Sequence, residues 1–250
     1  MIWWIIRMPT SYYLFTTENL RFGIAILWCV VGFGSYYFLS HSITCKRKFG
    51  APCRILDVQG NSVLLQRLLG FLFLGVISVV IILFLPKLSL KEYGLSFSFH
   101  SAPPTWSWLL IPLILIMGYF AARKPGNLEN YPQIRTKIWT PGMIVISSTS
   151  WILFLVGYEF LFRGFVLHAS LEIMDPMPAI ALNSALYAFA HFYKGLGETF
   201  GAIPVGILVC YITLITGNIW GAVILHSIMA LSNEWFSLRA HPNMLIEKVR

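Results

Sequence analysis

The sequence predicts an all-α membrane protein, a polytopic bundle of about seven transmembrane helices. Three observations support this fold class. Of the 250 residues, 57% are hydrophobic and only 11% are charged, and the mean hydropathy is +0.72, which lies outside the range of soluble domains. Apolar runs of membrane-spanning length recur along the chain. The basic residues gather between these runs, as topology signals do.

Seven apolar runs are long enough, or nearly so, to cross the hydrocarbon core of a bilayer. The predicted spans fall at residues 22–41, 66–86, 106–122, 141–171, 177–193, 200–216 and 218–238. Residues 1–20 open with MIWWIIRMPTSYY, and this apolar run is too short to span. Its tryptophans and tyrosines predict that it lies in the membrane interface. No small-residue cleavage site follows the first span, so we expect that span to remain as an anchor.

Two loops divide the predicted helices into two parts. The loops at 87–105 and 123–139 are rich in proline, glycine and asparagine, which favour turns over helix. The last four spans are joined by very short links. We therefore expect an N-terminal membrane part at 1–140 with about three spans, a compact four-helix core at 141–238 and a cytoplasmic tail at 239–250.

Lysine and arginine residues alternate between the two sides of the predicted membrane. One side holds Lys46, Arg47, Lys48, Arg54, Arg67, Arg123, Lys124, Arg135, Lys137, Lys194, Arg239, Lys248 and Arg250. The other side holds Arg7, Arg21, Lys87 and Lys91. The positive-inside rule then predicts a cytoplasmic C-terminus and, with seven spans, an external N-terminus. We attribute the net charge of +8 to basic residues that orient the protein among membrane lipids, not to a nucleic-acid-binding surface. We expect a multi-pass protein of a prokaryotic cell membrane.

Arg163 is the one basic residue predicted to lie deep within a span. Glu159 precedes it by four residues, which places the two side chains on one helix face. A buried ion costs several kcal/mol unless it is paired, so we predict an ion pair between them. Such a pair could simply pin one helix against its neighbours. Ionisable groups inside membrane segments equally favour a functional site.

Two further spans carry histidine in apolar surroundings. Span five places Asn183, Tyr187 and His191 on one stripe at four-residue spacing, and span seven carries His226. One histidine among apolar residues is more often a packing residue than a ligand. Two histidines and a carboxylate on three consecutive helices indicate a shared cavity. Such a set suits activation of a water by a general base, and it also suits a metal site.

The order of these elements resembles the CPBP family of intramembrane proteases, which includes the CAAX proteases and the bacteriocin-processing, Abi-type enzymes. The likeness covers about residues 141–235, with EFLFRG, a span ending in an aromatic-x-x-x-His step, a Gly-rich link and an intramembrane histidine. It implies a peptidase acting on a membrane-associated peptide or protein. It also implies catalytic roles for Glu159, Arg163, His191 and His226. The resemblance does not decide whether the enzyme uses a divalent metal such as zinc or no cofactor.

Two positions depart from the family pattern. In Glu-Glu-x-x-x-Arg, Glu159 matches the second glutamate, but Tyr158 stands where the family has the first, which is assigned to activating water. In His-x-x-x-Asn, Ala230 stands in place of asparagine. A phenol has a pKa of about 10 and is a poor base near neutral pH. Glu159 is therefore the carboxylate left for the base role, helped by the two histidines.

Three functions stay open at this level. The first is an active peptidase that cleaves near the cytoplasmic face with Glu159 as its base. The second is a family member without catalytic activity that binds a protein or a lipidated or hydrophobic peptide in the same cavity. The third is a small transporter whose polar groups line a path. The polar groups cluster in three adjacent helices without a pseudo-symmetric counterpart, which favours the first two.

Overall fold

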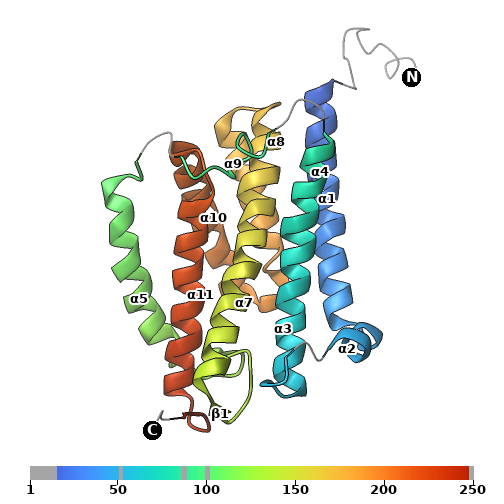
Figure 1. The fold of residues 1–250 in the computed structure, drawn as a ribbon. Helices are drawn as coiled ribbons and strands as arrows, with labels where there is room; N and C mark the ends of the chain where they lie inside the picture. Colours follow the sequence, from blue (N-terminus) through green and yellow to red (C-terminus); the bar gives the residue numbers. More distant parts are fainter. Residues whose placement is uncertain (1–15, 51–52, 86–88, 99–101, 248–250) are drawn as a thin grey trace, which may run out of the picture.

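The computed structural model describes residues 16–50, 53–85, 89–98 and 102–247, and these residues form a bundle of α-helices (Figure 1). Each of the seven predicted spans is helical, so the predicted all-α membrane fold is confirmed. Residues 1–15 of the predicted interfacial segment lie outside the described residues.

The N-terminal part contributes helices α1 to α6. Their bounds are α1 (Thr17–His41), α2 (Ile43–Phe49), α3 (Val58–Gly70), the π-helical segment η1 (Phe71–Val76), α4 (Ile77–Phe84), the 3₁₀ segment η2 (Thr105–Leu109), α5 (Leu110–Ala121) and α6 (Pro125–Leu128). The segments α3, η1 and α4 follow one another without a break and form the second predicted span. The segments η2 and α5 form the third.

The C-terminal part contributes the remaining helices. They are α7 (Pro141–Glu159), the π-helical segment η3 (Phe160–Val166), α8 (Leu167–Leu171), α9 (Pro176–Phe189), the 3₁₀ segment η4 (Phe192–Lys194), α10 (Leu196–Thr216) and α11 (Trp220–Ala240). Two short strands, β1 (Ile138–Trp139) and β2 (Leu245–Ile246), pair in parallel with Ile138 opposite Leu245. This pairing places residues 245–246 beside the residues that precede α7.

Four helices of the described chain are long and apolar enough to cross a membrane. They are Thr17–His41, Val58–Phe84, Pro141–Leu171 and Leu196–Thr216. The other three predicted spans are the shorter apolar helix Thr105–Ala121, α9 with 14 residues and α11 with 21 residues. The protein is therefore an integral membrane protein of several helices.

Side-chain caps decide where the long helices begin. The Thr140 hydroxyl accepts a hydrogen bond from the Met143 amide at 3.3 Å, directly before Pro141 opens α7. The Asp57 carboxylate accepts one from the Gly60 amide at 2.7 Å. This cap starts α3 at residue 58, well before the predicted span at 66–86. Arg67 therefore lies inside a helix, not in a loop as the charge pattern predicted, and only 2% of it is exposed.

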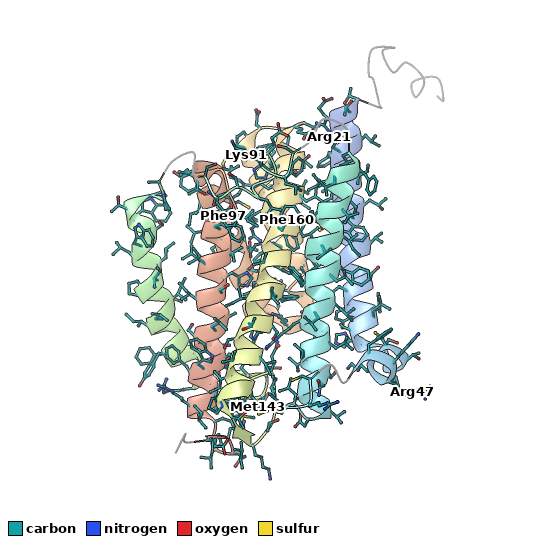
Figure 2. All side chains as sticks on the ribbon, viewed as in Figure 1. Arg21, Arg47, Lys91, Phe97, Met143 and Phe160 are labelled. Atoms are coloured by element: carbon teal, nitrogen blue, oxygen red, sulfur yellow. The ribbon has the colours of Figure 1, made fainter. Side chains whose placement is uncertain are left out.

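Helix α7 occupies the middle of the bundle (Figure 1). It contacts α3 and η1 on one side and α11 on the other. Helix α5 packs on α11, so the N-terminal helices flank the core from two sides. Helices α9 and α10 pack against each other and against η3. All seven residues of η3 are buried, and Phe160 lies midway along the bundle (Figure 2).

The two ends of the bundle carry the two predicted sets of charges. Arg21 and Lys91 lie at one end and Arg47 and Met143 at the opposite end (Figure 2). Arg21 is not a loop residue as predicted, because it lies in α1 with 8% exposed and contacts the Glu172 carboxylate at 3.1 Å. The Tyr93 hydroxyl donates to the same carboxylate at 2.9 Å. Burial and this hydrogen bond raise the pKa of Tyr93 above its ordinary value.

Two glycines bring the N-terminal part against α7 beside the predicted site. A Cβ added to Gly157 would lie 3.0 Å from the Gly75 nitrogen and 3.1 Å from Phe71 Cα. The neighbouring atoms belong to backbone, so a methyl group could fit only if the two helices moved apart. This close crossing lies one residue before Tyr158.

We expect Gly157→Ala to lower the free energy of unfolding by about 1–3 kcal/mol because it overpacks this crossing. Gly34→Ala, in α1, provides the matched control, since its added methyl would meet nothing within 4 Å. In the control, the better helix propensity of alanine should raise stability by about 0.5–1 kcal/mol. Denaturation of both variants in detergent gives the comparison, and equal effects at the two glycines would contradict the role of the crossing.

Candidate active site

The four predicted site residues come from three helical segments, and three of them contact or face the Tyr187 ring. Glu159 ends α7, Arg163 lies in η3, His191 follows α9 and His226 lies in α11. The Tyr187 ring lies 4.1 Å from the Arg163 guanidinium carbon, and its centroid is 4.7 Å from the His191 ring and 6.2 Å from the His226 ring. The structure thus brings together the side chains that the sequence separates by up to 67 positions.

The Glu159 carboxylate has a hydrogen-bond partner at Oε1 and an ion-pair contact at Oε2. Its Oε2 lies 3.3 Å from Arg163 Nη1, and its Oε1 lies 2.6 Å from His226 Nδ1. Only 1% of the Glu159 side chain is exposed. The predicted ion pair with Arg163 is confirmed. The contact with His226 is one that sequence spacing did not predict.

Arg163 is fully buried on η3. Its guanidinium stacks on the Tyr187 ring at 4.1 Å, a cation–π contact that partly replaces water around the charge. The π-helical segment starts directly after Glu159, and such segments are frequent at functional sites. Asn183 supports it, since its Nδ2 donates to the Phe162 carbonyl at 2.6 Å. The residues predicted on one face of span five therefore include Asn183, which bonds to the π-helical segment, as well as His191.

The hydrogen bonds of the two histidines settle which ring nitrogen carries hydrogen in the neutral form. An ionised carboxylate only accepts, so His226 Nδ1 donates to Glu159 and its Nε2 keeps a lone pair. A backbone carbonyl also only accepts, so His191 Nδ1 donates to the Tyr187 carbonyl at 2.9 Å. Both rings therefore have Nε2 as the nitrogen able to take a proton.

Tyr158 packs against both histidines. Its ring centroid lies 5.8 Å from that of His226 and 6.2 Å from that of His191, in edge-to-face geometry. The residue is 4% exposed, and within the described part of the chain its hydroxyl has no hydrogen-bond partner. The phenol ring thus fills the place where the resemblance implies a carboxylate. Ala230, the second departure, is half-buried one turn beyond His226 on α11.

The donor set does not match a metal site with three protein ligands. Within the described residues, no three histidine, cysteine, aspartate or glutamate side chains gather in a group that could hold a metal ion. The Glu159 oxygens face Arg163 and His226 Nδ1, and a tyrosine occupies the neighbouring position. A structural or catalytic zinc needs three or four converging ligands.

A second buried ion pair was missed from the sequence. Arg67 Nη2 lies 3.4 Å from Glu234 Oε1, with 3% and 1% of the two side chains exposed. Arg163 is thus not the only arginine deep within a helix, and the N-terminal spans do carry a polar group. The cap at Asp57 could have indicated it, because extending the helix back to that cap encloses Arg67.

The membrane bundle brings a carboxylate, an arginine and two histidines to one point, and ionisable groups gathered inside a membrane bundle indicate a functional site. Residues 137–232 match the family model described as type II CAAX prenyl endopeptidase Rce1-like. This match covers the segment that resembles the CPBP family of intramembrane proteases and supports that resemblance. No curated protein and no solved structure matches the chain. The matched segment contains Glu159, Arg163, His191 and His226 but neither Arg67 nor Glu234.

Proposed function

We propose that the chain is a weak intramembrane peptidase that hydrolyses a membrane-associated peptide or protein, with His226 Nε2 as its general base. The observation that carries this proposal is the 2.6 Å contact between Glu159 Oε1 and His226 Nδ1. A carboxylate bonded to one imidazole nitrogen orients the ring and stabilises its protonated form. The opposite nitrogen can then take a proton from water.

This assignment replaces the hypothesis that Glu159 itself is the base. Its Oε1 contacts His226 Nδ1 at 2.6 Å, and its Oε2 lies 3.3 Å from Arg163 Nη1, so both oxygens face a cationic or donor group. Glu159 instead orients His226, and the Arg163 guanidinium forms the ion pair with Glu159. His191 Nε2 is a second proton acceptor, on a ring whose centroid lies 4.7 Å from that of Tyr187.

The proposed reaction consumes one water, and His226 carries a proton from that water to the leaving amide nitrogen. Nε2 takes a proton from the water as its oxygen attacks the peptide carbonyl carbon, forming a C–O bond. His226 then returns the proton to the amide nitrogen as the C–N bond breaks. The products are a carboxylic acid and an amine, and the second proton of the water passes from the acid to the amine to give a carboxylate and an ammonium group.

The phenol ring of Tyr158 is the reason for proposing slow turnover. It occupies buried space against both histidines, where an attacking water would have to lie. The same observation favours a second candidate, a family member that binds a hydrophobic or lipidated peptide without cleaving it.

We also propose the orientation that the positive-inside rule predicts, with a cytoplasmic C-terminus. The basic helix α2 lies at the same end of the bundle as the C-terminus, which supports it (Figure 1). A prokaryotic cell membrane as the location stays a prediction from sequence.

Cleavage by the purified protein in lipid nanodiscs tests the function. Two quenched fluorescent substrates are used, a prenylated peptide ending in a CAAX sequence and an unprenylated transmembrane peptide. We expect slow cleavage of at least one, and a loss of about 100-fold in kcat for His226→Gln and for Glu159→Gln. His41→Gln, at the exposed end of α1, is the matched control and should not change the rate.

The outcomes separate the two candidates. Binding of a peptide without cleavage by the unmodified protein supports the second candidate. Turnover that survives both His226→Gln and Glu159→Gln would refute the proposed base and its orienting residue.

A further inference from the structure

The buried pair between Arg67 and Glu234 belongs to a polar network that the proposed reaction does not use. Arg67 Nη1 donates to the Ser147 carbonyl at 2.9 Å, to the Ser147 hydroxyl at 3.0 Å and to the Ser150 hydroxyl at 3.1 Å. Its Nη2 donates to Gln133 Oε1 at 3.1 Å and to Glu234 Oε1 at 3.4 Å. The guanidinium also stacks on the Trp151 ring at 4.3 Å.

This network bridges α7 and α11. The Ser147 hydroxyl of α7 donates to Glu234 Oε1 of α11 at 3.1 Å, and Arg67 holds both groups from α3. Glu234 also accepts from the Gln133 backbone amide at 3.2 Å, which attaches the loop before β1. Each oxygen of this buried carboxylate therefore accepts a hydrogen bond. All the donors come from parts of the chain outside α11.

The bond between Glu159 and His226 joins the same two helices at a second level. On α11, Glu234 follows His226 by eight residues, about 12 Å along the axis at 1.5 Å per residue. On α7, Ser147 precedes Glu159 by twelve residues, about 18 Å. Two helices joined at one level can still slide and rotate relative to each other. A second bridge removes that freedom.

We propose that Arg67 is a positioning residue that sets the register of α11 against α7 and so holds His226 Nδ1 on Glu159. The inference rests on the proposed function, in which that contact orients the base. Arg67 lies outside the family-matched segment 137–232, so an N-terminal helix completes the arrangement of the core site. Its planar fork reaches Ser147, Ser150, Gln133 and Glu234 at once, which a lysine ammonium cannot do.

The hydrogen position on His226 gives a readout that does not depend on turnover. Protein labelled with ¹⁵N-histidine is measured by NMR in nanodiscs, with His226→Gln used to assign the resonances. The unmodified protein should show His226 hydrogenated at Nδ1 when neutral. The double variant Arg67→Gln/Glu234→Gln removes both charges together, so no buried ion is stranded.

We expect the double variant to populate the Nε2-hydrogenated form of His226 and to lose about ten-fold or more in kcat, with KM changed less than about two-fold. The matched control is Arg21→Gln/Glu172→Gln. It removes an ion pair between α1 and the residue after α8, and this pair does not touch α11. The control should leave both readouts as in the unmodified protein.

An unchanged His226 hydrogen position in the folded double variant overturns the inference, and so does an equal change in the control. If the double variant does not fold, the same two measurements are made on Arg67→Lys. This variant keeps the positive charge but lacks the planar guanidinium that bonds to several groups at once. If the unmodified protein shows the Nδ1-hydrogenated form but cleaves neither substrate, the proposed function fails. The NMR comparison then still decides the role of Arg67.

Discussion

Arg163→Ala should lower the free energy of unfolding by about 3–5 kcal/mol. The substitution leaves the Glu159 carboxylate, whose side chain is 1% exposed, with His226 but without its cationic partner, and it removes the guanidinium from the Tyr187 ring. A buried charge without its partner cannot recover its hydration, so the cost exceeds the worth of the contact itself. Denaturation in detergent, followed by helical circular dichroism, measures the loss.

Two further variants make this prediction specific. Lys194→Ala breaks an ion pair with Glu198 at the same four-residue spacing, but those side chains are 26% and 42% exposed. It should change stability by no more than about 0.5 kcal/mol. Adding Glu159→Gln to Arg163→Ala should recover part of the lost stability, because no buried ion remains. An Arg163→Ala variant as stable as the unmodified protein would show that the pair is not a structural requirement.

Tyr158→Glu should raise the rate of peptide hydrolysis by about 100-fold or more. A glutamate has an ordinary pKa of about 4.3 and can accept a proton at neutral pH, whereas a phenol cannot. It is also smaller than the tyrosine ring that lies 5.8 Å from His226 and 6.2 Å from His191, so it leaves room for a water. The nanodisc cleavage assay measures kcat for both substrates.

Tyr158→Gln is the matched control, since it creates the same space without a base. Tyr158→Phe keeps the ring and removes only the hydroxyl. We expect neither to gain the activity of Tyr158→Glu. A gain in Tyr158→Gln equal to that in Tyr158→Glu would show that the ring limits turnover by volume alone. A loss of cleavage in Tyr158→Glu would show that a second carboxylate beside Glu159 is not tolerated there.

The lengths of the apolar runs and the composition predicted most of the fold. The seven apolar runs all became helices because a bilayer leaves backbone groups no partner except those within the same helix. The ion pair between Glu159 and Arg163 was also predictable, since both residues lie one turn apart on a single element. In each case the interaction is local, and local spacing is what a sequence displays directly.

Contacts between distant elements needed the tertiary structure. The sequence indicated that Glu159, His191 and His226 lie near one another, but not that Glu159 Oε1 contacts His226 Nδ1 at 2.6 Å. The charge pattern placed Arg67 in a loop because the sequence shows its neighbours and not Glu234, which lies 167 residues away. The sequence by itself determined the helices, the membrane class and the local ion pair. How α7, α11 and α3 pack decided which polar group meets which, because a buried side chain is paired by whatever faces it in space.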